Sequence, residues 1–177
     1  MTGQDKVELV AYNPGWSLLS KEEGSLLAGV LGELLITVHH IGSTAIPTIA
    51  AKPILDLLAV VSNLEGLDQH RHRMETIGYG WRGEYGLSGR RYCTKINPAT
   101  GRKSIHLHCY QTGSPAIDRH LAFRDYLLAR PDIAQAYYQQ KARCQGLHSQ
   151  DSQAYSQCKS EWIKGVEAEA LAHYNKR

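Results

Sequence analysis

A nearly continuous apolar run from Pro53 to Val61 constrains the fold of this chain most strongly. The run has the length of a β-strand, and such a pattern is typical of a strand that is covered on both faces. Asp56 carries the only charge within it. Because an ionised carboxylate buried without a partner costs several kcal/mol, we expect a cation, a metal or hydrogen-bond donors beside Asp56. The alternative is a structural aspartate near the strand end that accepts hydrogen bonds from backbone N–H groups.

Hydrophobic periodicity and turn signals predict the other elements of secondary structure. The expected strands cover Lys6–Ala11, Leu35–Ile41 and Gly78–Trp81, together with a β-hairpin made from Arg91–Asn97 and Lys103–Tyr110. The expected helices cover Trp16–Leu34, Leu64–Ile77, Pro115–Ala129, Asp132–Cys144 and Ser152–Tyr174. This order predicts one α/β (α+β) domain over residues 1–177. A mixed β-sheet flanked by helices occupies about residues 6–112 of it, and a helical part occupies about residues 113–175.

Charge and cysteine content narrow the class of protein. The net charge of +3 permits a phosphate-bearing small ligand but gives no independent case for nucleic-acid binding. The four cysteines form no CxxC pair, and we expect free thiols in a reducing compartment at Cys93, Cys109, Cys144 and Cys158. Charged residues or proline interrupt the most apolar segments, so we expect a cytoplasmic protein without a membrane span. The sequence gives no indication of an oligomeric state.

The segment Gly42-Ser43-Thr44 follows one predicted strand and precedes a short helical turn. Small residues there let backbone N–H groups approach a phosphate, and the hydroxyls of Ser43 and Thr44 can donate to it. Turns use the same residue types, so the segment alone is a weak signal. Asp56 lies thirteen positions after Ser43, on the next predicted strand. If the two strands are neighbours, the turn and the carboxylate face each other across one pocket.

Two histidines, His106 and His108, lie two positions apart in a predicted strand. Alternate residues of a strand point to the same face, so the two imidazoles share one face of the sheet. Paired imidazoles can bind a metal or contact a phosphate or a base, and they can equally form a hydrogen-bonded polar face. We favour contact with a phosphate or a base, because no further metal ligands are visible nearby in the sequence.

Basic side chains supply further candidates for phosphate binding. Arg90 and Arg91 follow two glycines in a tight loop and could clamp a phosphate bidentately, although a solvated basic loop is the alternative. Lys52, directly before Pro53, is a candidate of the same kind. Lys159 belongs to the last predicted helix, where an ordinary surface charge is the default interpretation.

Ordered motifs along nearly the whole chain resemble the GrpB family, a widespread group of bacterial proteins. The motifs are Tyr12-Asn-Pro-Gly-Trp, His40-Ile-Gly-Ser-Thr-Ala-Ile-Pro, Ala51-Lys-Pro-Ile-Leu-Asp, Gly83-Glu-Tyr-Gly-Leu-Ser-Gly-Arg-Arg-Tyr, Ile105-His-Leu-His, His120-Leu-Ala-Phe-Arg-Asp-Tyr-Leu and Tyr155-Ser-Gln-Cys-Lys-Ser-Glu-Trp-Ile. The resemblance implies a nucleotidyltransferase fold of the polymerase-β type. In active members of that superfamily, a Gly-Ser turn positions a triphosphate and three carboxylates hold two divalent metals.

Carried over to this chain, Gly42 and Ser43 match the turn, and Asp56 matches the first metal-binding carboxylate. The chain departs from the pattern at Leu58, where the second carboxylate is expected, and at the third strand, which carries the two histidines. Magnesium prefers oxygen ligands, so we expect an altered site with one divalent cation (Mg²⁺ or Mn²⁺) or none. Other oxygen donors that the chain could supply are Glu84, Asp118 and Asp125.

Three functions follow as hypotheses, all with a nucleotide or another phosphorylated small molecule as the partner. The first is nucleotidyl transfer, with a metal on Asp56. In this hypothesis Gly42 and Ser43 bind the phosphates, Arg91 and Lys52 stabilise the developing charge, and His106 or His108 is the general base. The second is a non-catalytic module, related to nucleotide or coenzyme A metabolism, that has kept the pocket. The third is a metal-dependent phosphoesterase built around Asp56, His106 and His108.

Overall fold

The computed structural model describes residues 6–175 and has a five-stranded mixed sheet at its centre. The strands are β1 (Leu35–Ile41), β2 (Leu55–Val61), β3 (Tyr79–Trp81), β4 (Arg90–Ile96) and β5 (Lys103–Gln111). Their order across the sheet is β1-β2-β5-β4-β3. Only the central pair β2 and β5 is parallel; the other neighbours are antiparallel.

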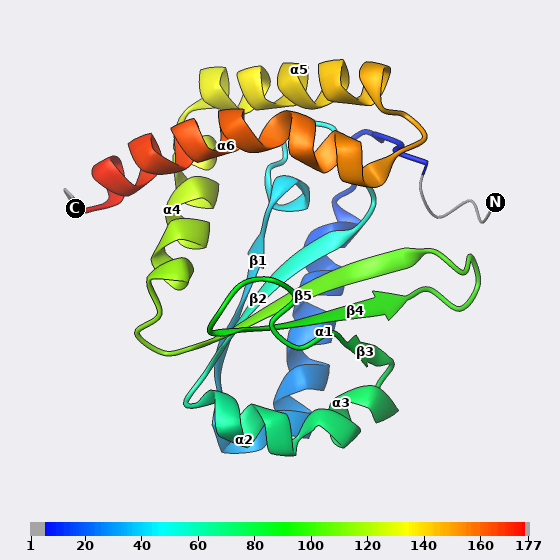
Figure 1. The fold of residues 1–177 in the computed structure, drawn as a ribbon, viewed down its shortest axis with the longest axis vertical. Coiled ribbons are helices and arrows are strands. Elements are labelled where there is room, and N and C mark those ends of the chain that lie inside the picture. Colours follow the sequence, from blue (N-terminus) through cyan, green and yellow to red (C-terminus); the bar gives the residue numbers. More distant parts are fainter. Residues whose placement is uncertain (1–5, 176–177) are drawn as a thin grey trace.

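Helices cover the sheet on two sides (Figure 1). They are α1 (Gly15–Leu31), α2 (Leu64–Gln69), α3 (Arg71–Thr76), α4 (Pro115–Ala129), α5 (Pro131–Leu147) and α6 (Ser152–Tyr174). Figure 1 shows α5 and α6 side by side across one end of the sheet. Two short 3₁₀ turns, η1 (Gly32–Leu34) and η2 (Ser43–Ala45), flank β1.

The predicted burial of β2 on both faces is confirmed. Leu55 and Leu57 belong to the main core, which α1 and α3 close with Leu27 and Met74. Leu58 points to the opposite face, where it packs in a smaller cluster with residues of α4. All three leucines of β2 are fully buried, as expected for a strand between two helical layers.

The predicted hairpin and several helices are also confirmed. Pro115–Ala129 and Ser152–Tyr174 match α4 and α6 residue for residue, and Leu35–Ile41 matches β1. The α+β class and the helical C-terminal part agree with the expected architecture. Within residues 6–175, no helix combines the length and the apolar character needed to cross a membrane.

Three predicted elements need correction. The segment Lys6–Ala11 is not a strand, because only Val10 makes a ladder contact, a single antiparallel bridge to Ala51. The expected helix over Leu64–Ile77 is divided at His70, whose Nδ1 atom lies 2.8 Å from the Gly66 carbonyl oxygen. The first helix ends at Leu31 and not at Leu34, because Gly32 adopts a positive φ of 56° that interrupts the helix.

The prediction of four free thiols is wrong for two of them. Cys144 of α5 and Cys158 of α6 form a disulfide, with Cα atoms 5.8 Å apart. They are separated by 14 positions, and the packing of α5 against α6 brings them together. Cys93 and Cys109 are free and buried in the sheet.

Candidate functional site

The turn after β1 packs directly on Asp56, as the spacing in the sequence suggested. Gly42 has φ +70° and ψ −167°, a backbone region that is essentially restricted to glycine. A Cβ atom placed on Gly42 would lie 2.8 Å from Asp56 Oδ2. Strands β1 and β2 are neighbours, with Ile41 opposite Asp56 in the antiparallel register. The missing side chain of Gly42 therefore makes room for the carboxylate.

Two histidines hold Asp56 in place. The parallel register pairs Asp56 with His106 and Leu58 with His108, so both imidazoles reach the face of the sheet that carries the carboxylate. His106 Nδ1 lies 3.3 Å and His108 Nε2 lies 3.4 Å from Asp56 Oδ1. Burial raises the pKa of the Asp56 carboxyl, but the hydrogen bonds from the two histidines outweigh it and hold that pKa well below its usual range. Asp56 is therefore ionised at neutral pH.

A third histidine, His120 of α4, extends this cluster beside His108. Its ring centroid lies 5.4 Å from that of His108. Burial and the neighbouring His108 lower the pKa of His120 to about 3, so its imidazole is neutral at physiological pH. His108 Nδ1 is buried and has no hydrogen-bond partner among residues 6–175. The three histidines therefore form a polar cluster beside Asp56 in which one nitrogen is unsatisfied.

A cavity of about 180 Å³ opens beside Asp56. It lies between the sheet, the η2 turn and the two C-terminal helices, and its lining is rich in hydroxyl and ammonium groups. The lining residues are Ser43, Thr44, Lys52, Ile54, Asp56, His106, Lys141, Tyr155, Ser156 and Lys159. The structure thus brings together the turn, the carboxylate, one histidine and two predicted lysines.

Three lysines converge on this cavity, and we call Lys52, Lys141 and Lys159 the lysine cluster. Lys52 donates to Ser152 Oγ at 3.1 Å and also lies over the ring of Tyr155. Burial, reinforced by the neighbouring Lys159, lowers the pKa of Lys52. Loss of water and repulsion from Lys159 thus perturb both Lys52 and Lys141.

Lys141 was not predicted, and it is the most deeply buried member of the cluster, with 1% of its surface exposed. Its Nζ atom donates to the Ala50 carbonyl oxygen at 2.6 Å and lies 4.9 Å from the centroid of the Tyr137 ring. Burial, and then Lys159, lowers the pKa of Lys141 to about 7. A helical pattern gives the one sequence signal for it, because Lys141 continues a buried stripe formed by Ala134, Tyr137 and Cys144.

The two arginines predicted to clamp a phosphate lie outside this cavity lining. Arg90 is buried and donates to the carbonyl oxygens of Glu84 and Tyr85. Arg91 pairs with Cys109 across the sheet, on the face opposite His108, and binds both carboxylate oxygens of Asp68 at 2.6 and 2.7 Å. Their guanidinium groups are thus used in structural contacts.

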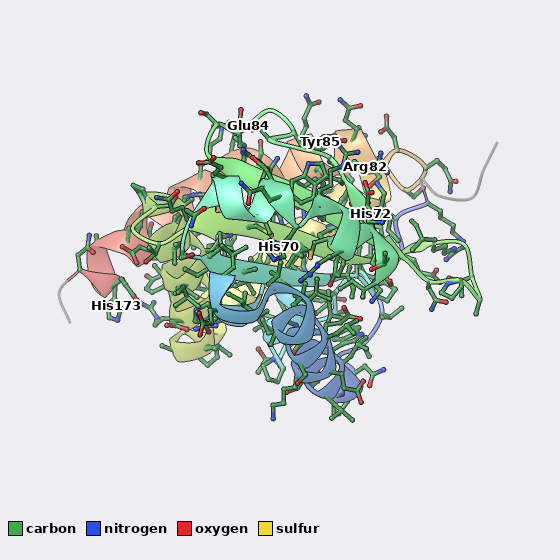
Figure 2. The ribbon with its side chains drawn as sticks, turned by 90° about the horizontal axis from the view of Figure 1, so that it is seen from below. His70, His72, Arg82, Glu84, Tyr85 and His173 are labelled. Carbon is green, nitrogen blue, oxygen red and sulfur yellow. A yellow bond between two sulfur atoms is a disulfide. The ribbon has the colours of Figure 1, made fainter. Side chains whose placement is uncertain are left out.

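The carboxylates considered as extra metal ligands also lie outside the lining. Glu84 lies on the outer loop before β4, where it accepts a hydrogen bond from Gly89 N (Figure 2). Asp125 is paired with Arg124 at 2.8 Å, and Asp118 does not line the cavity. Leu58 occupies the position of the second carboxylate and is fully buried. The part of the chain that is described contains no group of three His, Cys, Asp or Glu residues arranged to hold a metal, so a two-magnesium centre does not fit.

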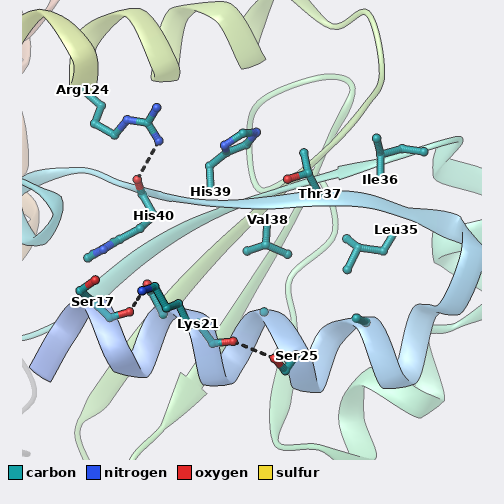
Figure 3. Close-up of a pocket in the computed structure, with 13 residues that line it drawn as sticks. Ser17, Lys21, Ser25, Leu35, Ile36, Thr37, Val38, His39, His40 and Arg124 are labelled. Atoms are coloured by element: carbon teal, nitrogen blue, oxygen red, sulfur yellow. Dashed lines mark hydrogen bonds between the residues drawn. The ribbon is translucent and has the colours of Figure 1, made fainter.

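A second, larger hollow of about 710 Å³ lies between α1 and β1 (Figure 3). Arg124 crosses one end of it and donates to the His40 carbonyl oxygen at 3.2 Å. Two of its serines, Ser20 and Ser25, donate to carbonyl oxygens of their own helix. None of its described lining residues carries a carboxylate. The smaller cavity therefore remains the better candidate, because it combines an ionised carboxylate with convergent cations.

Comparisons with known proteins agree on one family. The sequence model of the family described as "GrpB protein" matches residues 6–169. "UPF0157 protein YqkA" of Bacillus subtilis (strain 168) is 44% identical over 165 residues, covering 93% of this chain and 47% of that protein. The chain therefore spans about half the length of that relative.

Solved structures support the same grouping. The crystal structure of "conserved protein GrpB from Enterococcus faecalis" matches with a TM-score of 0.88 and 40% identity, covering 94% of this chain and 99% of that chain. The Cid1 poly(U) polymerase with magnesium and 3'-dATP matches with a TM-score of 0.51 and 12% identity, covering 77% and 44% of the two chains. At that identity the likeness shows a shared nucleotidyltransferase-like fold and no activity.

Proposed function

This chain belongs to the GrpB family and has a nucleotidyltransferase-like fold, and on that premise we propose that it binds the phosphate groups of a nucleotide beside Asp56. The observation that carries the proposal is the direct packing of the Gly42 turn on Asp56 at the edge of a cation-lined cavity. A glycine whose Cβ would collide with a strand carboxylate indicates a built site, because ordinary turns do not need that approach.

The ligand's phosphates fit the donors of the cavity. Ser43 presents a hydroxyl from the turn, whereas the buried hydroxyl of Thr44 is paired with His40 Nε2 at 2.7 Å. Lys52 presents an ammonium group from the segment before β2, and Lys159 presents one from α6. Oriented donors and cations of this kind bind phosphate strongly, because charge-assisted hydrogen bonds are about twice as strong as neutral ones. At about 180 Å³ the cavity is smaller than a site for a whole drug-sized molecule, which spans about 300–1,000 Å³. It therefore suits a phosphate chain, with the nucleoside outside.

We further propose nucleotidyl transfer as the reaction of this site, and the pairing of Asp56 with His106 favours it. An acceptor hydroxyl would attack the α-phosphorus, forming a new P–O bond while the bond to the leaving pyrophosphate breaks. The hydroxyl proton would pass to His106, which lines the cavity and whose Nδ1 atom lies 3.3 Å from the ionised carboxylate of Asp56. The non-catalytic alternative, in which the pocket only binds its ligand, is favoured by Leu58 in place of a second carboxylate.

A thermal-shift titration with the four nucleoside triphosphates and inorganic triphosphate tests the binding proposal. A ligand at a hundred times its Kd stabilises the folded state by about 2.7 kcal/mol, which raises Tm by several degrees. We expect Ser43→Ala to reduce the shift and Ser17→Ala, on the wall of the larger hollow, to leave it unchanged. If none of these compounds shifts Tm, the binding proposal is wrong.

The Asp56→Asn variant separates transfer from binding. It keeps the size of the side chain but removes the charge that the two histidines stabilise. We expect it to retain triphosphate binding and to lose release of pyrophosphate in the presence of acceptor mixtures. Asp118→Asn, outside the cavity, is the matched control. If the unmodified protein binds nucleotides but releases no pyrophosphate with any acceptor, the non-catalytic alternative is correct.

A further inference from the structure

The charges around the cavity do not resemble those of a metal-dependent phosphate site. Three ammonium groups come from separate parts of the chain: Lys52 precedes β2, Lys141 lies on α5 and Lys159 lies on α6. Asp56 is the one carboxylate among the residues that line the cavity. The lining therefore carries more positive than negative charge even before any ligand enters.

The single carboxylate is already occupied by hydrogen-bond donors. Both His106 Nδ1 and His108 Nε2 lie within 3.4 Å of the same oxygen, Asp56 Oδ1. A divalent cation on Oδ1 would have to displace these donors, and a cation on either oxygen would have to tolerate the neighbouring ammonium groups. Magnesium also demands near-octahedral oxygen coordination, and the buried side chain of Leu58 offers no oxygen.

Lys141 has a feature that calls for an anionic partner. Its surface is 1% exposed, and it forms no ion pair with a carboxylate within residues 6–175. Its ammonium group has only the Ala50 carbonyl oxygen and the face of Tyr137 as described partners. A buried ammonium group without a counter-charge is costly, and its pKa accordingly falls to about 7. An anionic ligand would favour the charged form, so a lysine in this position points to a ligand that supplies the counter-charge.

We propose that the lysine cluster takes the place of divalent cations, so that this pocket binds its phosphorylated ligand as a free polyanion and not as a magnesium complex. The inference rests on the proposed function, since it concerns how the same cavity recognises phosphate. It specifies the ligand class as a di- or triphosphate group without a bound metal. Lys52 contacts this group from the segment before β2, Lys159 contacts it from α6, and the deeply buried Lys141 contacts it from α5.

Isothermal titration of the full chain with ATP and with inorganic triphosphate, in excess EDTA and in excess Mg²⁺, tests the proposal. We expect both compounds to bind in EDTA at least as tightly as in Mg²⁺, because complexation with Mg²⁺ removes two negative charges from the ligand. Binding in Mg²⁺ that disappears in EDTA overturns this inference and leaves the proposed function standing. An absence of binding under both conditions overturns both.

Lysine variants show whether the cluster supplies the charge. We expect Lys141→Met and Lys159→Met each to weaken binding of triphosphate in EDTA roughly tenfold to a hundredfold, as expected for loss of a charged hydrogen bond. Lys164→Met is the matched control, because Lys164 lies on the same helix as Lys159 but is exposed and paired with Glu161. Circular dichroism verifies that each variant is folded. If Lys141→Met does not fold, the affinity of Lys159→Met, at a less buried position, tests the proposal. Unchanged affinity in the folded variants overturns the proposal.

Discussion

Replacing Gly42 with alanine is the sharpest test of the geometry around Asp56. The new Cβ would lie 2.8 Å from Asp56 Oδ2 and 3.1 Å from Asp56 Cβ, closer than non-bonded atoms tolerate. The backbone of Gly42, at φ +70° and ψ −167°, adds strain of about 1–3 kcal/mol for any other residue. Forcing an extra carbon into a packed site costs about another 1–3 kcal/mol. We expect Gly42→Ala to lose about 3 kcal/mol of unfolding free energy.

Gly32→Ala is the matched control for backbone strain. Gly32 also has a positive φ, of 56°, but no described atom lies within 4 Å of the position of its Cβ. This variant therefore has backbone strain of about 1–3 kcal/mol without the collision. Urea denaturation with unchanged m-values gives the free energy of unfolding of each variant. The melting temperature should fall by about 2–4 °C for each kcal/mol lost in a chain of this size.

Ligand binding should separate the two variants further. In Gly42→Ala the turn must move away from Asp56, and this displaces Ser43, whose hydroxyl lines the cavity. We expect triphosphate to stabilise Gly32→Ala as it stabilises the unmodified protein, and to have little effect on Gly42→Ala. Equal stability and equal ligand response in the two variants would refute the contact between the turn and Asp56.

The remaining predictions concern stability. Reducing the Cys144–Cys158 disulfide, or replacing both residues with serine, should cost about 3 kcal/mol in urea denaturation, from the entropy of a loop of this length; an unchanged midpoint would show that the bridge does not stabilise the fold. The pKa of Lys141 falls from 10.5 in the unfolded chain to about 7 in the folded protein. Between these pH values the unfolded chain binds one proton more than the folded protein does. The free energy of unfolding therefore rises with pH above 7, by about 1 kcal/mol per pH unit. Lys141→Met should remove that rise, and parallel pH profiles for the two proteins would contradict it. Glu23→Leu should cost about 1–3 kcal/mol, because the buried hydroxyl of Tyr79 donates to Glu23 at 2.8 Å and would lose its acceptor; equal melting temperatures would exclude this role.

Local sequence patterns were sufficient to predict the sheet and the part of the candidate site that lies on it. The apolar run around Asp56 predicts a strand covered on both faces, and Leu58 and its neighbours are buried in that way. Alternation predicts that His106 and His108 share a face, and the parallel register brings that face to the carboxylate. The Gly42 turn could be placed opposite Asp56 because β1 and β2, which follow one another in the chain, are also neighbours in the sheet.

Contacts between elements far apart in the chain were not predictable in the same way. Arg91 was a reasonable phosphate candidate, but its partner Asp68 lies 23 positions earlier, on a helix of the opposite face. Lys141 reads as an ordinary helix charge until α5 is placed against the end of the sheet. The disulfide escaped notice for the same reason, since it depends on the packing of two helices and not on a CxxC motif.

The origin of the positive charge makes the helical part integral to the candidate site. Asp56 and its histidines come from the sheet, but Lys141 and Lys159 come from α5 and α6. These two helices are joined by the disulfide, whose cysteines lie three residues after Lys141 and one residue before Lys159. A change in the packing of α5 against α6 would therefore move two of the three cations while leaving the sheet intact. If the proposed function is correct, affinity for phosphate should depend on the integrity of the helix pair, and not only on the strand and turn that carry Asp56 and Gly42.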